Sequence, residues 1–246
     1  VAISADGEYI VAGSYDDKVH LFEKESNTPL WSYTTGGNVR SVAISADGGY
    51  VVAGSQDNKV YLFDKDSNTP LWSYDTESVV KSVLISADGE YIIVGSSSLH
   101  LFSKDSSTPI RSYSFDGGIY DLAISADGEY IVLASTDGNA YFFDKDSSGA
   151  LWSYNVGDDA DSVAISADGE YLVAGSYGDK IYLYHKDSST SLWNYDTEAN
   201  IRQVSISSNG IIYKTDKKAI IYAKNVEKQS KIYKGQLREC QKSLNR

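Results

Sequence analysis

The sequence predicts an all-β protein made of six similar sheets, and three observations support this. A segment close to VAISADGEYIVAGS recurs along the chain, with starts 39 or 41 residues apart. A period near 40 residues with several short strands per repeat is typical of β-propellers. The repeats are rich in Val, Ile, Tyr and Phe and carry no apolar stripe of helical period, which excludes helical repeats of similar length. We therefore expect a six-bladed β-propeller with four antiparallel strands per blade, its units 1 to 6 starting at Val1, Val42, Val83, Leu122, Val163 and Val204.

Each unit divides into four expected strands, as unit 2 illustrates. Its turn at Asp47-Gly48 suits a tight hairpin, and the first two strands are apolar on both faces, as expected for strands covered by neighbouring blades. The four strands are expected at Val42–Ser45, Tyr50–Ser55, Val60–Asp64 and Leu71–Asp75.

A tryptophan recurs in the fourth strand of most units. Burying a Trp contributes at least about 2 kcal/mol from its apolar area alone, and one blade cannot bury its own faces, so several must stack. We expect these side chains to pack between neighbouring blades. They are Trp31, Trp72, Trp152 and Trp193, with Arg111 in the same place in unit 3.

These residues resemble two known repeat families. Ser-Ala-Asp-Gly-Glu-Tyr-Ile-Val-Ala-Gly-Ser is similar to the core of WD40 repeats, and Lys-Val-Tyr-Leu-Phe-Asp-Lys-Asp-Ser with Leu-Trp-Ser-Tyr resembles PQQ-like repeats, as in outer-membrane assembly lipoproteins and quinoprotein dehydrogenases. The resemblance covers residues 1 to about 225 and implies the propeller fold. The chain departs from WD40 repeats at Phe63-Asp64 and Phe143-Asp144, where that family has Trp-Asp, and it lacks the Gly-His dipeptide. It departs from quinoproteins in having no vicinal Cys pair.

The end of unit 6 allows two interpretations. Its third strand is expected at Ala219–Ala223, and Lys231–Gly235 takes the place of the fourth strand. Alternatively, Val226–Arg246 forms one helix with an apolar face. We favour the strand, which gives a propeller over residues 1–235 and a basic tail over 236–246 that is a short helix or a linker. The chain contains no Met, so we expect it to be part of a longer protein in which a strand before Val1 completes the last blade.

Charge and composition exclude several classes of partner. The net charge is −12, and residues 214–246 carry ten basic and three acidic side chains, which leaves −19 for residues 1–213. An acidic body repels nucleic-acid phosphates, so we expect no nucleic-acid partner. No apolar run approaches the ~18 residues that span a bilayer, so we expect no membrane span in this segment. The single cysteine, Cys240, excludes an intrachain disulfide and a Cys-based metal site.

The loops at one end of the propeller are the predicted binding site. Positions shared by all units serve the fold, whereas positions that differ are free to serve a partner. Basic and tyrosine side chains at the mouth of the channel are suited to holding an anionic or polar group, although neutral variation of exposed loops explains the same pattern. The residues are Arg40, Lys81, Tyr120, Asp161 and Arg202 before each first strand, and Tyr15, Gln56, Ser97, Thr136 and Tyr177 between the second and third strands.

We predict no catalytic site, metal or cofactor. Turns such as Asp64-Lys65-Asp66 alternate oxygen ligands as calcium loops do, but no Glu follows at the twelfth position, and these residues are ordinary turn formers. His20, His100 and His185 belong to different blades and cannot share a metal. We therefore expect a non-catalytic scaffold that binds a protein partner. The alternatives are a structural module of a cell-surface or filament assembly and, with only fold analogy behind it, a quinone-dependent enzyme.

Overall fold

The computed structural model describes residues 1–115, 117–207, 212–214 and 220–221, and all their regular secondary structure is β-strand. Units 1 to 5 each form a four-stranded antiparallel sheet, and the described part of unit 6 forms a three-stranded one. Within every sheet the strands follow chain order from one edge to the other. The prediction of an all-β chain of repeated four-stranded sheets is thus confirmed.

The strands have nearly the same lengths in every unit. Those of units 1 to 3 are β1 Ala2–Ile3, β2 Tyr9–Gly13, β3 Lys18–Glu23, β4 Trp31–Thr34, β5 Val39–Ile44, β6 Tyr50–Ser55, β7 Lys59–Asp64, β8 Trp72–Asp75, β9 Ser82–Ile85, β10 Tyr91–Gly95, β11 Ser98–Ser103 and β12 Arg111–Ser114. Those of units 4 to 6 are β13 Ile119–Ile124, β14 Tyr130–Ser135, β15 Asn139–Asp144, β16 Trp152–Asn155, β17 Ala160–Ile165, β18 Tyr171–Ser176, β19 Lys180–His185, β20 Trp193–Asp196, β21 Val204–Ile206, β22 Ile212–Lys214 and β23 Ile220–Ile221.

Three of the four strands predicted for unit 2 match the structure to within one residue. The exception is β5, which begins at Val39, three residues before its predicted start, because the chain is already paired with β6 on the far side of a β-bulge. In unit 6, β23 lies inside the predicted strand Ala219–Ala223. The strand predicted at Lys231–Gly235, the alternative helix and the basic tail lie outside the described residues.

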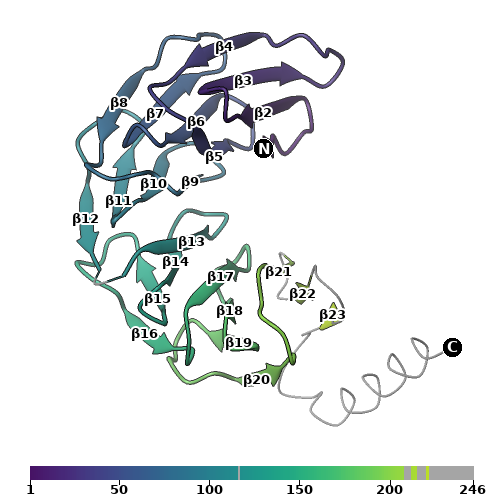
Figure 1. Ribbon diagram of the computed structural model, residues 1–246, viewed down its shortest axis with the longest axis vertical. Coiled ribbons are helices and arrows are strands. Elements are labelled where there is room, and N and C mark those ends of the chain that lie inside the picture. The colour runs from purple at the N-terminus through teal and green to yellow at the C-terminus, as the bar shows by residue number, and fades with distance from the viewer. Residues whose placement is uncertain (116, 208–211, 215–219, 222–246) are drawn as a thin grey trace, which may run out of the picture.

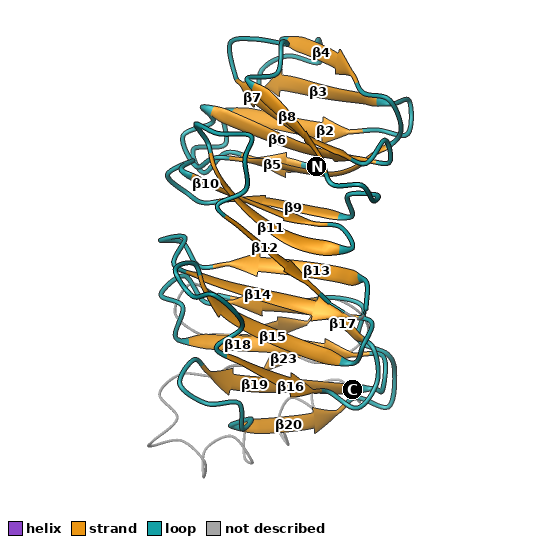
Figure 2. Cartoon of the chain, turned by 90° about the vertical axis from the view of Figure 1, so that its left-hand side faces the viewer, coloured by secondary structure: helices purple, strands orange, loops and turns teal. Residues whose placement is uncertain are grey.

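The sheets are arranged radially (Figure 1). The first strand of each unit lies toward the centre, the fourth strand lies on the outside, and the described sheets follow an arc from β1–β4 to β21–β23. The view turned by 90° shows the sheets stacked face against face (Figure 2). The first strands of successive units therefore lie side by side along the inner wall of the arc.

The core lies between the sheets. Val11, Val19 and Leu21 of unit 1 pack against Val51 and Phe63 of unit 2, and all five side chains are fully buried. Equivalent clusters fill the next three junctions. Because each sheet is covered by its neighbours, the two faces of a strand such as β6 are both apolar.

The recurring tryptophan closes the junctions after units 1, 2 and 4 on their outer side, which confirms the prediction of packing between units. The Trp31 indole lies against Phe63, with 5.2 Å between ring centroids, and its Nε1 donates a hydrogen bond to the carbonyl oxygen of Lys65 at 2.6 Å. Trp72 and Trp152 donate to the equivalent carbonyls of the next units. The tryptophan thus combines apolar burial with one directional bond between units.

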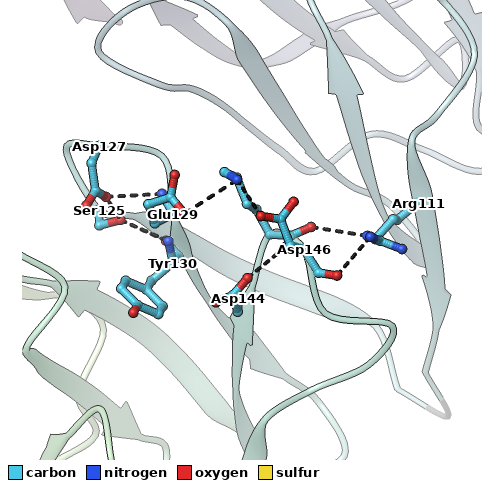
Figure 3. Close-up of polar contacts among 8 residues, drawn as sticks. Arg111, Ser125, Asp127, Glu129, Tyr130, Asp144 and Asp146 are labelled. Carbon is cyan, nitrogen blue, oxygen red and sulfur yellow. Dashed lines mark hydrogen bonds and ion pairs between the residues drawn. The ribbon is translucent and has the colours of Figure 1, made fainter.

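In unit 3, Arg111 makes the same junction by other means (Figure 3). Its Nε donates to the carbonyl oxygen of Lys145 at 3.2 Å, and its Nη2 donates to that of Asp146 at 2.8 Å. The hydrogen bond between units therefore persists although the indole is absent.

The repeated Ser-Ala-Asp-Gly motif forms the hairpin between the first two strands. In unit 4, Ser125 Oγ donates to Asp127 Oδ1 at 2.5 Å and accepts a bond from the Tyr130 backbone N–H at 2.9 Å (Figure 3). The hydroxyl bond from serine lowers the pKa of the equivalent carboxyl groups Asp6, Asp47 and Asp88. The invariance of this motif is explained by the turn itself.

Candidate functional site

Three of the predicted mouth residues sit where the strand ladder is interrupted. In unit 2, Val39 pairs with Ser55 and Ser41 pairs with Gly54, so Arg40 has no partner across the ladder and forms a β-bulge. Tyr120 and Asp161 are the bulge residues of units 4 and 5. A bulge turns a side chain out of the regular in–out alternation. The chain therefore presents at these positions side chains that take no part in sheet packing.

The mouth residues form separate cation–aromatic pairs. The Arg40 guanidinium lies 5.9 Å from the ring centroid of Tyr15, the Lys81 ammonium 5.8 Å from that of Tyr120, and the Arg202 guanidinium 5.1 Å from that of Tyr177. Two of these contacts, those of Arg40 and Arg202, join a loop before a first strand to a loop between second and third strands. Each contact contributes about 0.5–1 kcal/mol at an exposed site. Each of the three cations lies over a different tyrosine ring, and among them only Arg202 lines the cavity described next.

A cavity of about 350 Å³ lies where β13, β17 and the segment before β21 approach one another. Tyr120, Asp161 and Arg202 line it, so the structure brings three of the predicted residues together. Arg40, Lys81, Tyr15 and Tyr177 are not among its lining residues.

Asp121, which the sequence analysis did not single out, is a further lining residue. It occupies the position one residue beyond the bulge, where the other units have Ser41, Ser82, Ser162 and Gln203. One carboxylate among serines was the available signal, and comparison of the copies one position further along would have found it.

The side chains at this position connect neighbouring units along the inner wall. Ser41 Oγ accepts a hydrogen bond from the backbone N–H of Val83 at 3.1 Å. Asp121 Oδ2 accepts from the backbone N–H of Val163 at 3.0 Å and from Ser162 Oγ at 2.9 Å. Burial raises the pKa of Asp121, and these hydrogen bonds oppose that shift. The Asp121 side chain is therefore fixed by hydrogen bonds in the wall of the cavity.

Asp161 is held differently. Its side chain is only 9% exposed, and among the described residues its one attractive side-chain contact is an ion pair with Arg202, with 3.7 Å between Oδ2 and Nη1. This distance is too long for a hydrogen bond. Burial raises the pKa of Asp161, Arg202 lowers it, and the nearby Asp159 raises it further. Arg202 itself is 65% exposed and lies at the rim.

The histidines lie in three different sheets, as predicted. Nδ1 of His20 and of His100 each share a hydrogen bond with a serine of the adjacent fourth strand, and His185 pairs with Glu170. Within the described ranges, no three His, Cys, Asp or Glu side chains gather in a way that could hold a metal ion. In the same part of the chain, no helix has the length and apolar character needed to cross a bilayer.

Two family models match the chain. Residues 1–109 match the model described as outer membrane protein assembly factor BamB, and residues 107–144 match the WD domain, G-beta repeat. The second match spans β12 to β15, which are the last strand of one unit and the first three strands of the next. No curated protein matches the chain. The matched repeats and the recurring four-stranded sheets agree, and the chain is a protein of WD40-like and PQQ-like β-propeller repeats.

Proposed function

We propose that this protein is a non-catalytic binding module that holds a protein partner at the channel end formed by the bulges of units 2, 4 and 5. One observation carries the proposal: three positions that differ between copies, those of Arg40, Tyr120 and Asp161, lie outside the strand ladder. Residues that are the same in the copies form the hairpins within each unit and the contacts between units. The WD40 repeat supports this function because such repeats typically mediate protein interactions.

Exposed tyrosines provide the means of contact in this proposal. Tyr15, Tyr120 and Tyr177 are 70%, 46% and 43% exposed, and all lie at the mouth. Tyrosine is enriched among residues that dominate binding energy at protein interfaces. Each ring already carries a cation from the same end of the molecule, which limits the side-chain entropy lost on binding.

We further propose that six blades close into a ring, with unit 6 covering the outward face of unit 1. That face carries Ile10 and Phe22, which are half-buried, whereas their counterparts in unit 2, Val51 and Phe63, are fully buried against unit 1. An apolar face of this kind is stable only when a further sheet covers it. The carbonyl of Lys24 is the counterpart of those that receive the tryptophan bonds elsewhere.

The experiment compares two triple variants in partner capture. Tyr15→Ala/Tyr120→Ala/Tyr177→Ala removes the mouth aromatics. The matched control, Leu30→Ala/Leu71→Ala/Leu151→Ala, removes three side chains of similar exposure (47%, 52% and 51%) next to the outer strands. We expect the first variant to lose the captured proteins that the control retains, as read by quantitative mass spectrometry. Equal recovery with both variants would remove the mouth as the binding surface.

A further inference from the structure

The cavity between units 4, 5 and 6 has an unusual balance of charge. Its inner wall carries the carboxylates of Asp121 and Asp161, whereas its one lining cation, Arg202, stands at the exposed rim. Asp159 lies close enough to Asp161 to act on its pKa, and Asp158 adjoins it in the chain. Lys81 does not line the cavity, and its ammonium lies 5.8 Å from the ring centroid of Tyr120. The interior is therefore negative on a chain that is acidic as a whole.

Asp161 supplies the second, independent observation. More than nine-tenths of its side chain is buried, and it lines the cavity. An ionised carboxylate can accept about four hydrogen bonds, yet the one attractive side-chain contact of Asp161 within the described residues is the long ion pair with Arg202. Most of the acceptor capacity of this cavity-lining carboxylate is therefore unused by the protein. A donor that enters the cavity would satisfy it.

We infer that this cavity receives a positively charged side chain, the guanidinium or ammonium group of an arginine or lysine of the partner. This inference rests on the proposed binding function and names the chemical group of the partner that enters the cavity. The entering group donates to Asp161, and the electrostatic field of Asp121 stabilises its charge. The Tyr120 ring at the entrance offers an aromatic face to the aliphatic stem or to the cation. A volume of about 350 Å³ holds either side chain.

Substitution of Arg202 can test whether the cavity binds a cation or an anion. In the free protein it is the cation nearest to Asp161, so it competes with an entering cation. Arg202→Gln should therefore tighten the binding of a basic ligand, whereas it would weaken the binding of an acidic one.

The test uses the full chain and four pentapeptides of sequence Gly-Gly-X-Gly-Gly, where X is arginine, lysine, citrulline or glutamate. Citrulline keeps the size of arginine and removes its charge. We expect millimolar binding of the arginine and lysine peptides by NMR titration, and at least tenfold weaker binding of the other two. Comparison of arginine with lysine then identifies which cation fits better.

Three variants complete the design. Asp161→Asn should weaken the arginine peptide about tenfold, and Arg202→Gln should tighten it. Asp66→Asn, which removes an equal charge from an exposed side chain of the turn between β7 and β8, should leave its affinity unchanged. Unfolding midpoints of all three variants confirm that they are folded.

Two outcomes would overturn the inference. Citrulline or glutamate binding as well as arginine would show that positive charge is not recognised, and an equal loss in Asp66→Asn would show that only net charge matters. If partner capture still depends on the mouth tyrosines in either case, the proposed function stands and only the inferred ligand chemistry fails.

Discussion

At the residue scale, the junctions between units depend on one side chain that does two things. Trp72 stacks on Phe102 with 5.3 Å between ring centroids, and its Nε1 donates to the Lys104 carbonyl at 2.7 Å. We expect Trp72→Phe to lower the free energy of unfolding by about 1 kcal/mol, since it loses the hydrogen bond and keeps a ring. Trp72→Ala should cost about 3 kcal/mol, since it also leaves a cavity. Urea unfolding measures both, and equal losses would mean that the ring contributes little.

His100 should make the free energy of unfolding depend on pH. It is 7% exposed, its Nε2 has no hydrogen-bond partner among the described residues, and burial lowers its pKa. The unfolded chain, with a histidine pKa of about 6.5, therefore binds the proton more readily than the folded one. Stability from His100 is present above that pKa and falls as the pH drops through it. Between pH 7.5 and pH 5, the unfolding midpoint of His100→Phe should fall less steeply than that of the wild type; parallel curves would contradict this.

At the scale of the element, small and large residues are matched between neighbouring strands. Near the end of the second strand stand Gly13, Gly54, Gly95 and Gly175, and a methyl group at Gly13 would lie 2.5 Å from Cγ1 of Val39. The equivalent partners of the other glycines are Val80, Ile119 and Ile201. In unit 4 the two side chains are of equal size, with Ala134 at the glycine position and Ala160 in the same core cluster. The combined volume of the two facing side chains therefore varies little from one junction to the next.

This matching predicts a rescue. Gly54→Ala should lower the free energy of unfolding by about 1–3 kcal/mol through overpacking against Val80. Val80→Ala alone should cost about 2 kcal/mol, because Val80 is fully buried. The double variant reproduces the pair found in unit 4, so its loss should fall at least 1 kcal/mol short of the sum. Additive losses in a double-mutant cycle would show that the two sites do not touch.

The strands also show how much of the fold can be predicted from the sequence. The repeat period and the apolar strand pattern predicted both ends of β6 correctly. The hairpin before it and the loop after it contain the turn-forming residues Asp, Gly and Asn, which mark those ends in the sequence. The start of β5 was placed late, because a bulge conceals pairing on its far side. Arg40, Tyr120 and Asp161 were found because they vary, and the same comparison one position further along would have found Asp121. The cavity depends on the approach of three units, which no single repeat specifies.

At the scale of the whole molecule, ring closure is the property to measure. Phe63 is fully buried in its junction, and Phe22 occupies the same place on the outward face of unit 1. In a closed ring, Phe22→Ala and Phe63→Ala should each lower the free energy of unfolding by about 3 kcal/mol. On an open face the loss should stay below about 1 kcal/mol. Chemical unfolding of both variants, with the mass checked by light scattering, decides between them. A concentration-dependent increase in mass would show instead that a second copy covers this face, as in a filament.

The β-bulges have a consequence for how this protein can change. A residue outside the ladder register can be exchanged without displacing the strands on either side, so positions 40, 120 and 161 can acquire new chemistry while the scaffold keeps its shape. Units 2, 4 and 5 each place one such position at the same end of the sheets. Recognition and architecture can therefore evolve almost independently in this chain.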